Sequence, residues 1–413
     1  MTLERLLHYV SLDGAGGVEQ QFVEFVRVAR EQGVPDHDVV ACGRRVHPLI
    51  RSRLEDSQAA LAFEKYAGRF KLPKWPAALR AGRQRRLVAS CQPDAVVIWN
   101  RLRDSVDTLA AAGAERTIYW ERGASWFVGD SREKRRFLAE VPAIICNSHA
   151  ARRMLELRWG YQGQIRVVHN ALRPSLLPAE MVQPRRLPET RQITLGLVAR
   201  LQPIKGVTLA IHALALLRAQ GWDASLRIAG DGPEAQRLQE EVQRVGMGEH
   251  VIFEGLLADM SAFYQRIDLL VHPALREPFG QIAVEAGAYG IPAVVAAVDG
   301  LVEVIEEGVT GLCVKPTLPL SDYRELGGGE NDLPPYVYDP VADAIDTPRV
   351  VDPGELARAI AICLDDVDRY QAMSAQAIAA VAHRFVFDDH VHDALASIDA
   401  FVHLGRLDPG ARP

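Results

Sequence analysis

The sequence predicts an α/β protein with two doubly wound parallel sheets, and three observations support this fold class. Short β-rich runs alternate with helical patterns, as expected when helical crossovers join strands into a parallel sheet. The alternation is interrupted at the proline-rich stretch 173–191 and then starts again, so the chain divides into two halves. The 413 residues, of which 48% are hydrophobic and 24% charged, suffice for two or three domains with cores of their own.

Each half follows the same order of elements. Strands are expected where β-branched and aromatic residues form short runs, and helices where apolar residues recur every three or four positions. In the front half the expected strands are Leu6–Val10, Asp38–Ala41, Ala95–Trp99, Thr117–Trp120, Ala143–Cys146 and Ile165–Val168, and the expected helices are Val18–Arg30, Arg80–Ala89 and Ala150–Arg158. In the rear half the expected strands are Ile193–Val198, Ser225–Ile228, Val251–Phe253, Leu269–Val271 and Ala293–Val295, and the expected helices are Gly206–Ala219, Glu234–Val245 and Phe279–Tyr289.

The pattern predicts a front domain at 1–178 and a rear domain at 186–383. The stretch Gln371–Leu404 is helical in pattern, and we expect a C-terminal helix, about 384–413, to pack back on the front domain. Open α/β sheets bind ligands beyond the carboxyl ends of their strands, so two such sheets facing each other predict one deep cleft between the domains.

Residues 317–353 break the alternation of strands and helices. They are rich in acids and contain Gly327-Gly328-Gly329 and Pro334-Pro335. We interpret them as an inserted surface loop. Such a loop is either a lid or partner-binding element, or a tolerated insertion without a role of its own.

Charge and cysteine content narrow the class of protein. The net charge of −6 combines +8 over residues 1–180 with −14 over residues 181–413, which suggests that the two halves meet different partners. The five cysteines are scattered and form no Cys-x-x-Cys pair, which argues against a disulfide framework or a zinc site. The sequence has neither a run of eighteen apolar residues nor a signal-peptide pattern, so we expect a cytoplasmic protein.

The most informative stretch is 276–286, Arg-Glu-Pro-Phe-Gly-Gln-Ile-Ala-Val-Glu-Ala. If its Pro-Phe-Gly turn starts a helix, Glu277 and Glu285 lie near one face, roughly 12 Å apart along the axis. The N–H groups and the positive dipole end of that helix suit a diphosphate. The spacing therefore fits an activated sugar, held by its hexose at one end and its ribose at the other. The alternative is an ordinary helix with one buried and one exposed glutamate.

Further motifs accompany this stretch in a fixed order. Gly196–Gly206 reads Gly-Leu-Val-Ala-Arg-Leu-Gln-Pro-Ile-Lys-Gly, and Ala229–Glu234 reads Ala-Gly-Asp-Gly-Pro-Glu. The remaining motifs are Phe253–Gly255, Asp268–Pro273, Glu277–Gly280, Asp299–Ile305 and Gly308–Gly311. Over about 190–316 the series resembles the retaining glycosyltransferases of family 4, which have the GT-B fold of two Rossmann-like domains. Over 1–180 the resemblance is looser.

For the rear domain the resemblance implies a nucleotide-sugar donor site. Arg200 and Lys205 should neutralise the departing diphosphate in place of a divalent metal. No Asp-x-Asp stands where a metal-dependent sugar transferase would need it, so we expect no metal and no cofactor. Glu277 should hold donor-sugar hydroxyls, and Glu285 the ribose hydroxyls. The other donor-binding positions, which supply backbone N–H groups or a tight turn, are Gly230, Phe279, Gly280 and Gln281.

For the front domain the resemblance implies a glycine-rich turn and further cleft residues. The turn Gly14–Glu19 contains Gly16 and Gly17, whose backbone should close over the diphosphate, since glycine permits close approach and positive φ. Where many relatives carry a histidine, this sequence has Glu121 and Arg122. These two either contact the donor or orient the acceptor hydroxyl, or they form an ion pair at the cleft edge. Asn170 either lines the cleft or caps a turn.

A basic stretch at 63–86 carries eight lysines and arginines, four interleaved aromatic residues and one acid, Glu64. This composition suits an anionic membrane surface or a phosphorylated glycolipid. No nucleic-acid motif accompanies it, so we expect no nucleic-acid partner. The remaining alternative is an ordinary solvated helix face.

These observations predict a metal-independent retaining glycosyltransferase of hexosyltransferase type. It would use a UDP- or GDP-sugar and a glycan or glycolipid acceptor, in cell-envelope polysaccharide or lipopolysaccharide biosynthesis. It would be cytoplasmic and peripheral at the inner face of the membrane. Two rivals remain: a sugar-nucleotide 2-epimerase of the same fold, and a catalytically silent nucleotide-binding scaffold. The sequence does not specify the nucleotide, the sugar, the acceptor or the linkage.

Overall fold

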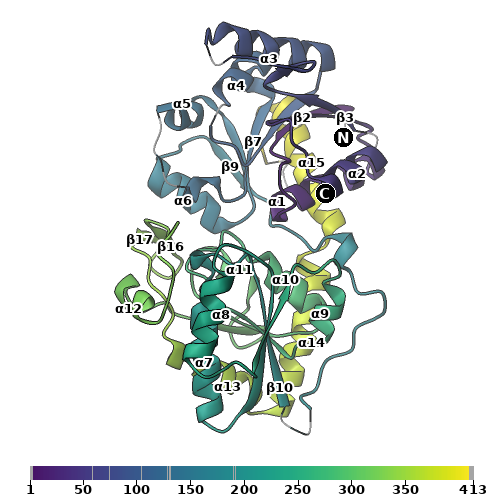
Figure 1. Ribbon diagram of the computed structural model, residues 1–413. Helices are drawn as coiled ribbons and strands as arrows, with labels where there is room; N and C mark the ends of the chain where they lie inside the picture. Colours follow the sequence, from purple (N-terminus) through teal and green to yellow (C-terminus); the bar gives the residue numbers. More distant parts are fainter. Residues whose placement is uncertain are drawn as a thin grey trace. The chain divides into compact units, whose positions relative to one another are not determined.

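The computed structural model describes residues 3–57, 59–73, 75–103, 105–127, 129, 132–188, 190 and 192–408. The chain forms two compact units: unit 1 is Met1–Arg173 with Phe387–Pro413, and unit 2 is Pro174–Val386. Each unit is built on a parallel sheet covered by helices (Figure 1). The prediction of two doubly wound α/β sheets is confirmed.

Unit 1 has parallel strands in the order β3-β2-β1-β6-β7-β8-β9. The strands are β1 (Arg5–Val10), β2 (Asp36–Ala41), β3 (Ala60–Phe63), β6 (Ala95–Trp99), β7 (Thr117–Glu121), β8 (Ala143–Cys146) and β9 (Gln164–Val167). The helices are α1 (Gly17–Glu31), α2 (Pro48–Asp56), α3 (Ala78–Cys91), α4 (Val106–Ala112), α5 (Arg132–Glu140), α6 (His149–Trp159) and α15 (Phe387–Leu404). Strand β3 is missing from the expected elements because its sequence, Ala-Leu-Ala-Phe, is short and contains no β-branched residue.

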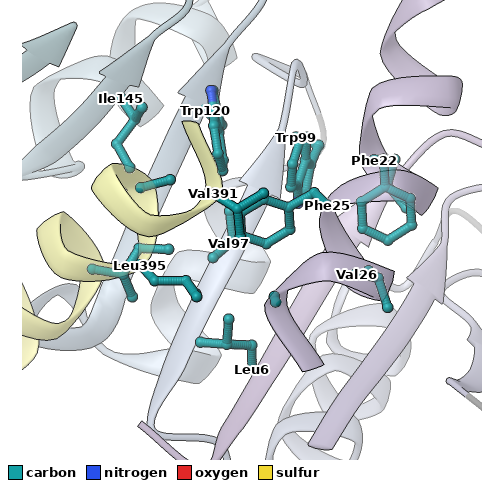
Figure 2. Packing of buried hydrophobic residues seen from close by; sticks show 14 of the residues in the cluster. Leu6, Phe22, Phe25, Val26, Val97, Trp99, Trp120, Ile145, Val391 and Leu395 are labelled. Carbon is teal, nitrogen blue, oxygen red and sulfur yellow. The ribbon is translucent and has the colours of Figure 1, made fainter. Parts of the chain in front are cut away.

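The core of unit 1 joins the two ends of the chain. Figure 2 shows Val391 and Leu395 of α15 in one cluster with Phe25 of α1 and Val97 of β6. The apolar face of α15 is thus buried in this unit, although the helix lies more than 200 residues beyond the rest of it in sequence. Burying each large apolar side chain contributes about 1.5–3 kcal/mol, so the last helix is part of the core of unit 1.

A chain of hydrogen bonds crosses the same core. Trp99 donates from Nε1 to His8 Nδ1 at 3.1 Å, and His8 Nε2 lies 2.8 Å from His37 Nδ1. His37 Nε2 lies 3.1 Å from the carbonyl oxygen of Val34. All three contacts are satisfied when both rings are neutral and protonated on Nε2. Burial lowers the pKa of His8 well below its ordinary value and lowers the pKa of His37 to about 4.

Unit 2 has parallel strands in the order β12-β11-β10-β13-β14-β15. The strands are β10 (Gln192–Val198), β11 (Asp223–Ala229), β12 (Val251–Gly255), β13 (Leu269–His272), β14 (Ala293–Ala296) and β15 (Gly311–Val314). The helices are α7 (Val207–Ala219), α8 (Ala235–Arg244), α9 (Ser261–Gln265), α10 (Gln281–Ala288), α11 (Leu301–Val304), α12 (Leu320–Glu325), α13 (Pro353–Leu364) and α14 (Val367–Arg384). The strand order reverses between β10 and β13, the type of position where open α/β sheets bind ligands.

The C-terminal tail is two helices and not one. Helix α14 ends at Arg384 in unit 2, and α15 begins at Phe387 in unit 1. Phe385, between them, is buried and lies edge-on to Phe279 with ring centroids 6.0 Å apart. This aromatic contact fixes the end of α14 within unit 2 before the chain returns to unit 1.

The inserted segment, residues 317–353, is not the plain surface loop that its glycines, prolines and acids predict. It contains α12 and an antiparallel hairpin of β16 (Val337–Asp339) and β17 (Ala344–Asp346). Its ends pair with each other through a bridge between Leu318 and Val350. The composition is misleading because the glycines here allow close packing, as shown below.

Within the part of the chain that the structure describes, no helix has the length and apolar character that crossing a membrane requires. Residues 409–413 of the expected C-terminal helix, and Glu189 and Arg191 of the proline-rich stretch, lie outside the described residues.

Candidate active site

A cavity of about 600 Å³ opens at the carboxyl ends of the strands of unit 2. Residues that follow four strands line it. After β10 come Ala199, Arg200 and Lys205, and after β11 come Gly230, Asp231 and Gly232. After β12 come Leu256, Leu257 and Met260. His272 is the last residue of β13, and Glu277 lies in the loop that follows it. Of the predicted site residues, Arg200, Lys205, Glu277 and Gly230 therefore meet in one cavity.

The charged centre of this cavity is a cluster of Lys205, Glu277 and His272. Lys205 Nζ donates to Glu277 Oε2 at 2.7 Å, and His272 Nε2 lies 3.2 Å from the same oxygen. Burial by itself raises the pKa of the Glu277 carboxyl, but the charge of Lys205 and the hydrogen bonds from Lys205 and His272 outweigh it and hold that pKa well below its usual range. Glu277 is therefore a carboxylate at neutral pH and accepts hydrogen bonds only.

His272 lines this cavity and was not among the residues selected from the sequence. Burial lowers its pKa, and Lys205 lowers it further, while Glu277 acts in the opposite direction. The ring is therefore neutral at pH 7 and directs Nε2–H toward Glu277. Its position as the last residue of a buried strand was the available signal, because parallel strands end at the ligand edge of the sheet.

The turn at Gly230 explains why that motif contains glycine. Gly230 has a φ of +131°, which non-glycine residues rarely adopt. A Cβ at this position would lie 1.9 Å from the carbonyl oxygen of Ala199. Glycine thus lets the turn after β11 lie directly against the turn after β10, where Arg200 projects from an exposed position.

Helix α10 begins at Gln281, two residues later than predicted, and Glu277 precedes it in a loop. The expectation that Glu277 and Glu285 lie on one continuous helix is therefore wrong, because the Pro-Phe-Gly turn is not helical. Gly280, the N-cap residue, has a φ of +104°. Phe279 is buried. The first N–H groups of α10, starting with Gln281, lie at the end of the helix that a diphosphate favours.

Glu285 has a different environment from Glu277. It is 6% exposed and accepts a hydrogen bond from the Tyr264 hydroxyl at 2.9 Å. Ile282, one turn earlier in α10, lines the cavity, whereas Glu285 is not among the lining residues. Its predicted contact with a ribose stays a prediction.

The remaining predicted site residues lie in unit 1. Glu121 is fully buried and accepts hydrogen bonds from the N–H groups of Gly123 and Ser125, at 2.6 and 3.1 Å, and from the Tyr119 hydroxyl at 2.8 Å. Burial raises its pKa, although these hydrogen bonds act against the rise. The Glu121 carboxylate thus holds together the turn that carries Arg122.

Arg122 does not direct its guanidinium at Glu121. It donates from Nη2 to Asn170 Oδ1 and lies over the rings of Trp99 and Trp120, 5.2 Å from each centroid. Nη1 is buried and has no hydrogen-bond partner among the described residues. Burial lowers the pKa of Arg122 to about 9, so the side chain is still a cation at neutral pH. The structure thus brings Arg122 and Asn170 together.

The glycine-rich turn precedes α1 as expected, with Gly16 as the N-cap residue and Gly17 as the first helical residue. Gly16 has a φ of −78°, so the positive-φ explanation for glycine is wrong at this position. A Cβ at Gly17 would meet nothing within 4 Å. A Cβ at Gly16 would lie 3.2 Å from the Glu19 carboxylate. The close-approach explanation for these glycines stays a prediction.

This chain has two Rossmann-like units, and unit 2 has a charged cavity where its strand order reverses. These features are typical of the GT-B class. The chain belongs to the GT-B glycosyltransferases of family 4. Residues 15–176 match the family model described as Glycosyltransferase Family 4, and residues 180–321 match the one described as Glycosyl transferases group 1.

Several curated relatives are glycosyltransferases of different specificity. Glycogen synthase of Mycobacterium tuberculosis is 31% identical over 222 residues, which is 51% of this chain and 50% of the relative. The chain thus spans about half the length of that relative. The lipopolysaccharide core biosynthesis glycosyltransferase LpsD of Rhizobium meliloti is 26% identical over 286 residues, 69% of this chain and 76% of LpsD. A GDP-mannose-dependent alpha-mannosyltransferase of Corynebacterium glutamicum is 40% identical over 131 residues, 30% of this chain and 29% of the relative.

Solved structures share the fold over nearly the whole chain. Anabaena Alr3699/HepE in complex with UDP superposes with a TM-score of 0.73 at 19% identity, covering 96% of this chain and 100% of HepE. WaaG, a glycosyltransferase involved in lipopolysaccharide biosynthesis, superposes with a TM-score of 0.62 at 16% identity, covering 94% of this chain and 98% of WaaG. The GT-B fold predicted from the sequence is confirmed.

Proposed function

We propose that this glycosyltransferase retains anomeric configuration and moves a hexose from a UDP- or GDP-sugar to a glycan or glycolipid acceptor of the cell envelope. The observation that carries the proposal is the cluster of Lys205, Glu277 and His272 at the strand ends of unit 2. A permanent carboxylate beside a cation offers acceptors for sugar hydroxyls and donors for phosphate oxygens in one place. A solved structure of HepE is a complex with UDP, which supports the proposed donor class. LpsD is a lipopolysaccharide core biosynthesis glycosyltransferase, which supports the proposed acceptor class.

In the proposed reaction the acceptor oxygen bonds to the anomeric carbon as the bond from that carbon to the diphosphate oxygen breaks. The acceptor attacks from the same face that the diphosphate leaves, so configuration is retained without a protein nucleophile. The acceptor proton passes to the leaving phosphate, so no protein base is needed. Negative charge grows on the diphosphate, where Lys205, Arg200 and the N–H groups of α10 would stabilise it. This set of donors is why we propose that no divalent metal and no cofactor is required.

Glu277 would accept hydrogen bonds from donor-sugar hydroxyls while Lys205 and His272 keep it ionised. Two further donor contacts are proposed in unit 2. Glu285 would accept hydrogen bonds from the ribose hydroxyls, and the backbone at Phe279, Gly280 and Gln281 would bind the phosphates. In unit 1 we propose that Arg122 meets substrate charge, with Asn170 anchoring it and Glu121 as the positioning residue of its turn. Gly16 and Gly17 would allow the backbone before α1 to approach the diphosphate.

A ligand screen separates the donor classes. UDP-, GDP- and ADP-sugars are tested by thermal shift, because a ligand bound to the folded state raises its stability. We expect a UDP- or GDP-sugar to raise the melting temperature, and transfer to an envelope-glycan acceptor to survive EDTA. Activity that requires a divalent ion would contradict the metal-free site. Conversion of the donor to its epimer without an acceptor would favour the epimerase.

We further propose that the segment 63–86 meets an anionic membrane or a phosphorylated glycolipid. Phe70 and Trp75 are 72% and 84% exposed, and exposed cations surround them in sequence, namely Arg69, Lys71, Arg85 and Arg86. The one acid, Glu64, is 5% exposed and pairs with Arg101 at 2.9 Å, so its charge is neutralised inside the unit. The surface charge of the segment is then cationic. Lys74, one of the eight lysines and arginines of the segment, lies outside the described residues.

Vesicle binding tests this surface. Changing Lys71, Arg85 and Arg86 to Glu should release the protein from vesicles that contain anionic lipid, and leave binding to neutral vesicles unchanged. The control carries the same charge change on unit 2, at the exposed residues Arg349, Arg358 and Arg369. Equal loss of vesicle binding in both variants would show that the loss comes from the change in net charge and not from this segment. No loss in either variant would contradict the proposal that the segment binds a membrane.

A further inference from the structure

The inserted segment 317–353 contacts both loops that supply the ion pair of the cavity. Lys205 lies in the short 3-10 turn Pro203–Lys205, and Glu277 lies in the loop before α10. These loops touch directly, because the N–H of Leu275 donates to the carbonyl oxygen of Ile204 at 2.9 Å. The contacts that the insertion makes with each loop determine what it can do.

The first contact is made by α12. Tyr323 is 1% exposed and donates from its hydroxyl to the carbonyl oxygen of Pro203 at 2.8 Å. That carbonyl begins the turn that ends at Lys205. The backbone after α12 is tied down as well, since the carbonyl oxygen of Leu326 lies 2.9 Å from Nε2 of His212 in α7. In Figure 1, α12 and the β16–β17 hairpin lie near each other at one side of unit 2, to which both belong.

The glycines after α12 make this approach possible. A Cβ at Gly328 would lie 2.5 Å from the ring of Tyr323. A Cβ at Gly329 would lie 2.7 Å from the Pro203 side chain and 2.2 Å from the Glu234 carboxylate. Gly327-Gly328-Gly329 therefore marks a tightly packed contact with the Lys205 turn and not a flexible linker.

The second contact is made by β16 through Asp299. Asp299 is fully buried and accepts two hydrogen bonds, one on each carboxylate oxygen. Oδ1 accepts from the N–H of Tyr338 in β16 at 2.8 Å, and Oδ2 accepts from the N–H of Glu277 at 3.0 Å. The N–H of Asp299 donates to the carbonyl oxygen of Tyr338 at 3.1 Å, and the N–H of Gly300 donates to that of Glu277 at 3.1 Å. One side chain thus links the insertion to the backbone of Glu277.

The backbone of Asp299 is held in an uncommon conformation. Its φ is +48°, in the left-handed region that costs a non-glycine residue on the order of 1 kcal/mol or more. Such conformations persist where surrounding contacts fix them. Here the contacts are those with β16 and with the Glu277 loop, so the strained residue stands between the insertion and the active-site carboxylate.

We infer that the insertion is a two-point brace that sets the distance between Lys205 and Glu277, with Tyr323 and Asp299 as positioning residues. The inference rests on the proposed function of that pair. The segment is then neither a lid nor a tolerated surface loop. A diphosphate and a sugar bound at one ion pair require both charges to be placed closely, since a misplacement of about 1 Å can cost on the order of 100-fold in rate.

Two conservative substitutions remove the brace contacts without removing a charged residue of the cavity. In Asp299→Asn, the amide group must face one of two N–H donors, so one of the two hydrogen bonds is lost. In Tyr323→Phe, the hydroxyl bond to the carbonyl oxygen of Pro203 is lost. We expect kcat at saturating donor to fall about tenfold or more in the first and a few-fold in the second.

Matched controls separate positioning from stability. Tyr370→Phe removes an equivalent buried hydroxyl, which donates to the carbonyl oxygen of Asp268 at 2.7 Å at the opposite end of β13. Asp346→Asn makes the same acid-to-amide change on the exposed outer strand of the hairpin. Tyr370→Phe should lose as much melting temperature as Tyr323→Phe, and both controls should keep kcat within about twofold of the parent, because neither touches a cavity loop.

The outcome is read in kcat, and separately in the affinity for UDP and GDP measured by thermal shift. If Tyr323→Phe and Tyr370→Phe change kcat alike, or if Asp299→Asn keeps parental kcat and affinity, the brace is refuted. If the parent protein transfers no sugar, the proposed function fails. The brace then stands or falls on whether Asp299→Asn weakens UDP or GDP binding more than Asp346→Asn does.

Discussion

Each unit holds a cation near a glutamate, and the two arrangements differ in where their charge is directed. In unit 2, Lys205 and Glu277 pair with each other at the wall of a cavity of about 600 Å³. In unit 1, the Glu121 carboxylate accepts hydrogen bonds from its own turn, and Arg122 lies over two tryptophan rings with Asn170 as its hydrogen-bond partner. The comparison teaches that a charged pair in sequence identifies a site only when the fold leaves its polar atoms facing a cavity.

The largest effect expected from this contrast is on Lys205. Lys205→Met should lower kcat by on the order of 100- to 1,000-fold, because it removes the cation that we propose stabilises the departing diphosphate. Steady-state transfer with the preferred nucleotide-sugar measures it. Arg218→Met, at a partly exposed arginine of α7 far along the helix from the cavity turn, is the control and should keep parental turnover.

The second largest effect is expected on the free energy of unfolding when Glu121 is replaced. Glu121→Gln places an amide group among three donors, so at least one buried N–H or O–H loses its acceptor, at a cost of about 1–3 kcal/mol. Urea unfolding should show this loss, while the folded fraction keeps kcat within a few-fold of the parent. A large fall in kcat at unchanged stability would instead make Glu121 a catalytic residue like Glu277.

The smallest effect is expected on the pH dependence of the stability of unit 1, through His37. The folded-state pKa of His37 is about 4, below the ordinary value of 6.5, so the unfolded state binds more protons between these pH values. Stability is therefore fully present above about pH 6.5 and declines as the pH falls, by about 2 kcal/mol at pH 5 for this one ring.

Tryptophan fluorescence can follow this loss, since Trp222 is the one tryptophan of the six that belongs to unit 2. Urea unfolding at pH 7.5 and pH 5 should differ in the parent and differ less in a His8→Leu, His37→Leu double variant. The same pH dependence in both proteins would show that the buried histidine chain is not its source.

Much of the fold could be predicted from the sequence because the signals were local. Buried parallel strands such as Ala95–Trp99 read as continuous apolar runs, and the helices between them repeat apolar residues at helical spacing. Strand β3 could not be found this way, since none of its four residues is β-branched and its tertiary support is the pairing with β2. The sequence predicted a C-terminal helix from about 384, and in the structure α15 begins at Phe387.

The site was predictable to the extent that it rests on short turns. Arg200, Lys205, Gly230 and Glu277 follow strand ends, so their meeting in one cavity follows from the parallel sheet. The roles of His272 and Asp299 were not predictable, because each depends on a partner fixed by tertiary structure. The insertion was misjudged for the same reason: Gly327-Gly328-Gly329 has the composition of a loop, and only its contacts with Tyr323 and Pro203 show a packed element.

The central claim is that Glu277, held ionised by Lys205 and His272, binds the donor sugar. The most direct measurement is the turnover of Glu277→Ala with the preferred nucleotide-sugar and acceptor, compared with the parent at equal folded concentration. Loss of transfer by on the order of 100-fold or more, with UDP or GDP still binding, is the result expected if the carboxylate acts on the sugar and not on the nucleotide. Turnover within about threefold of the parent would contradict the assignment of this cavity as the active site.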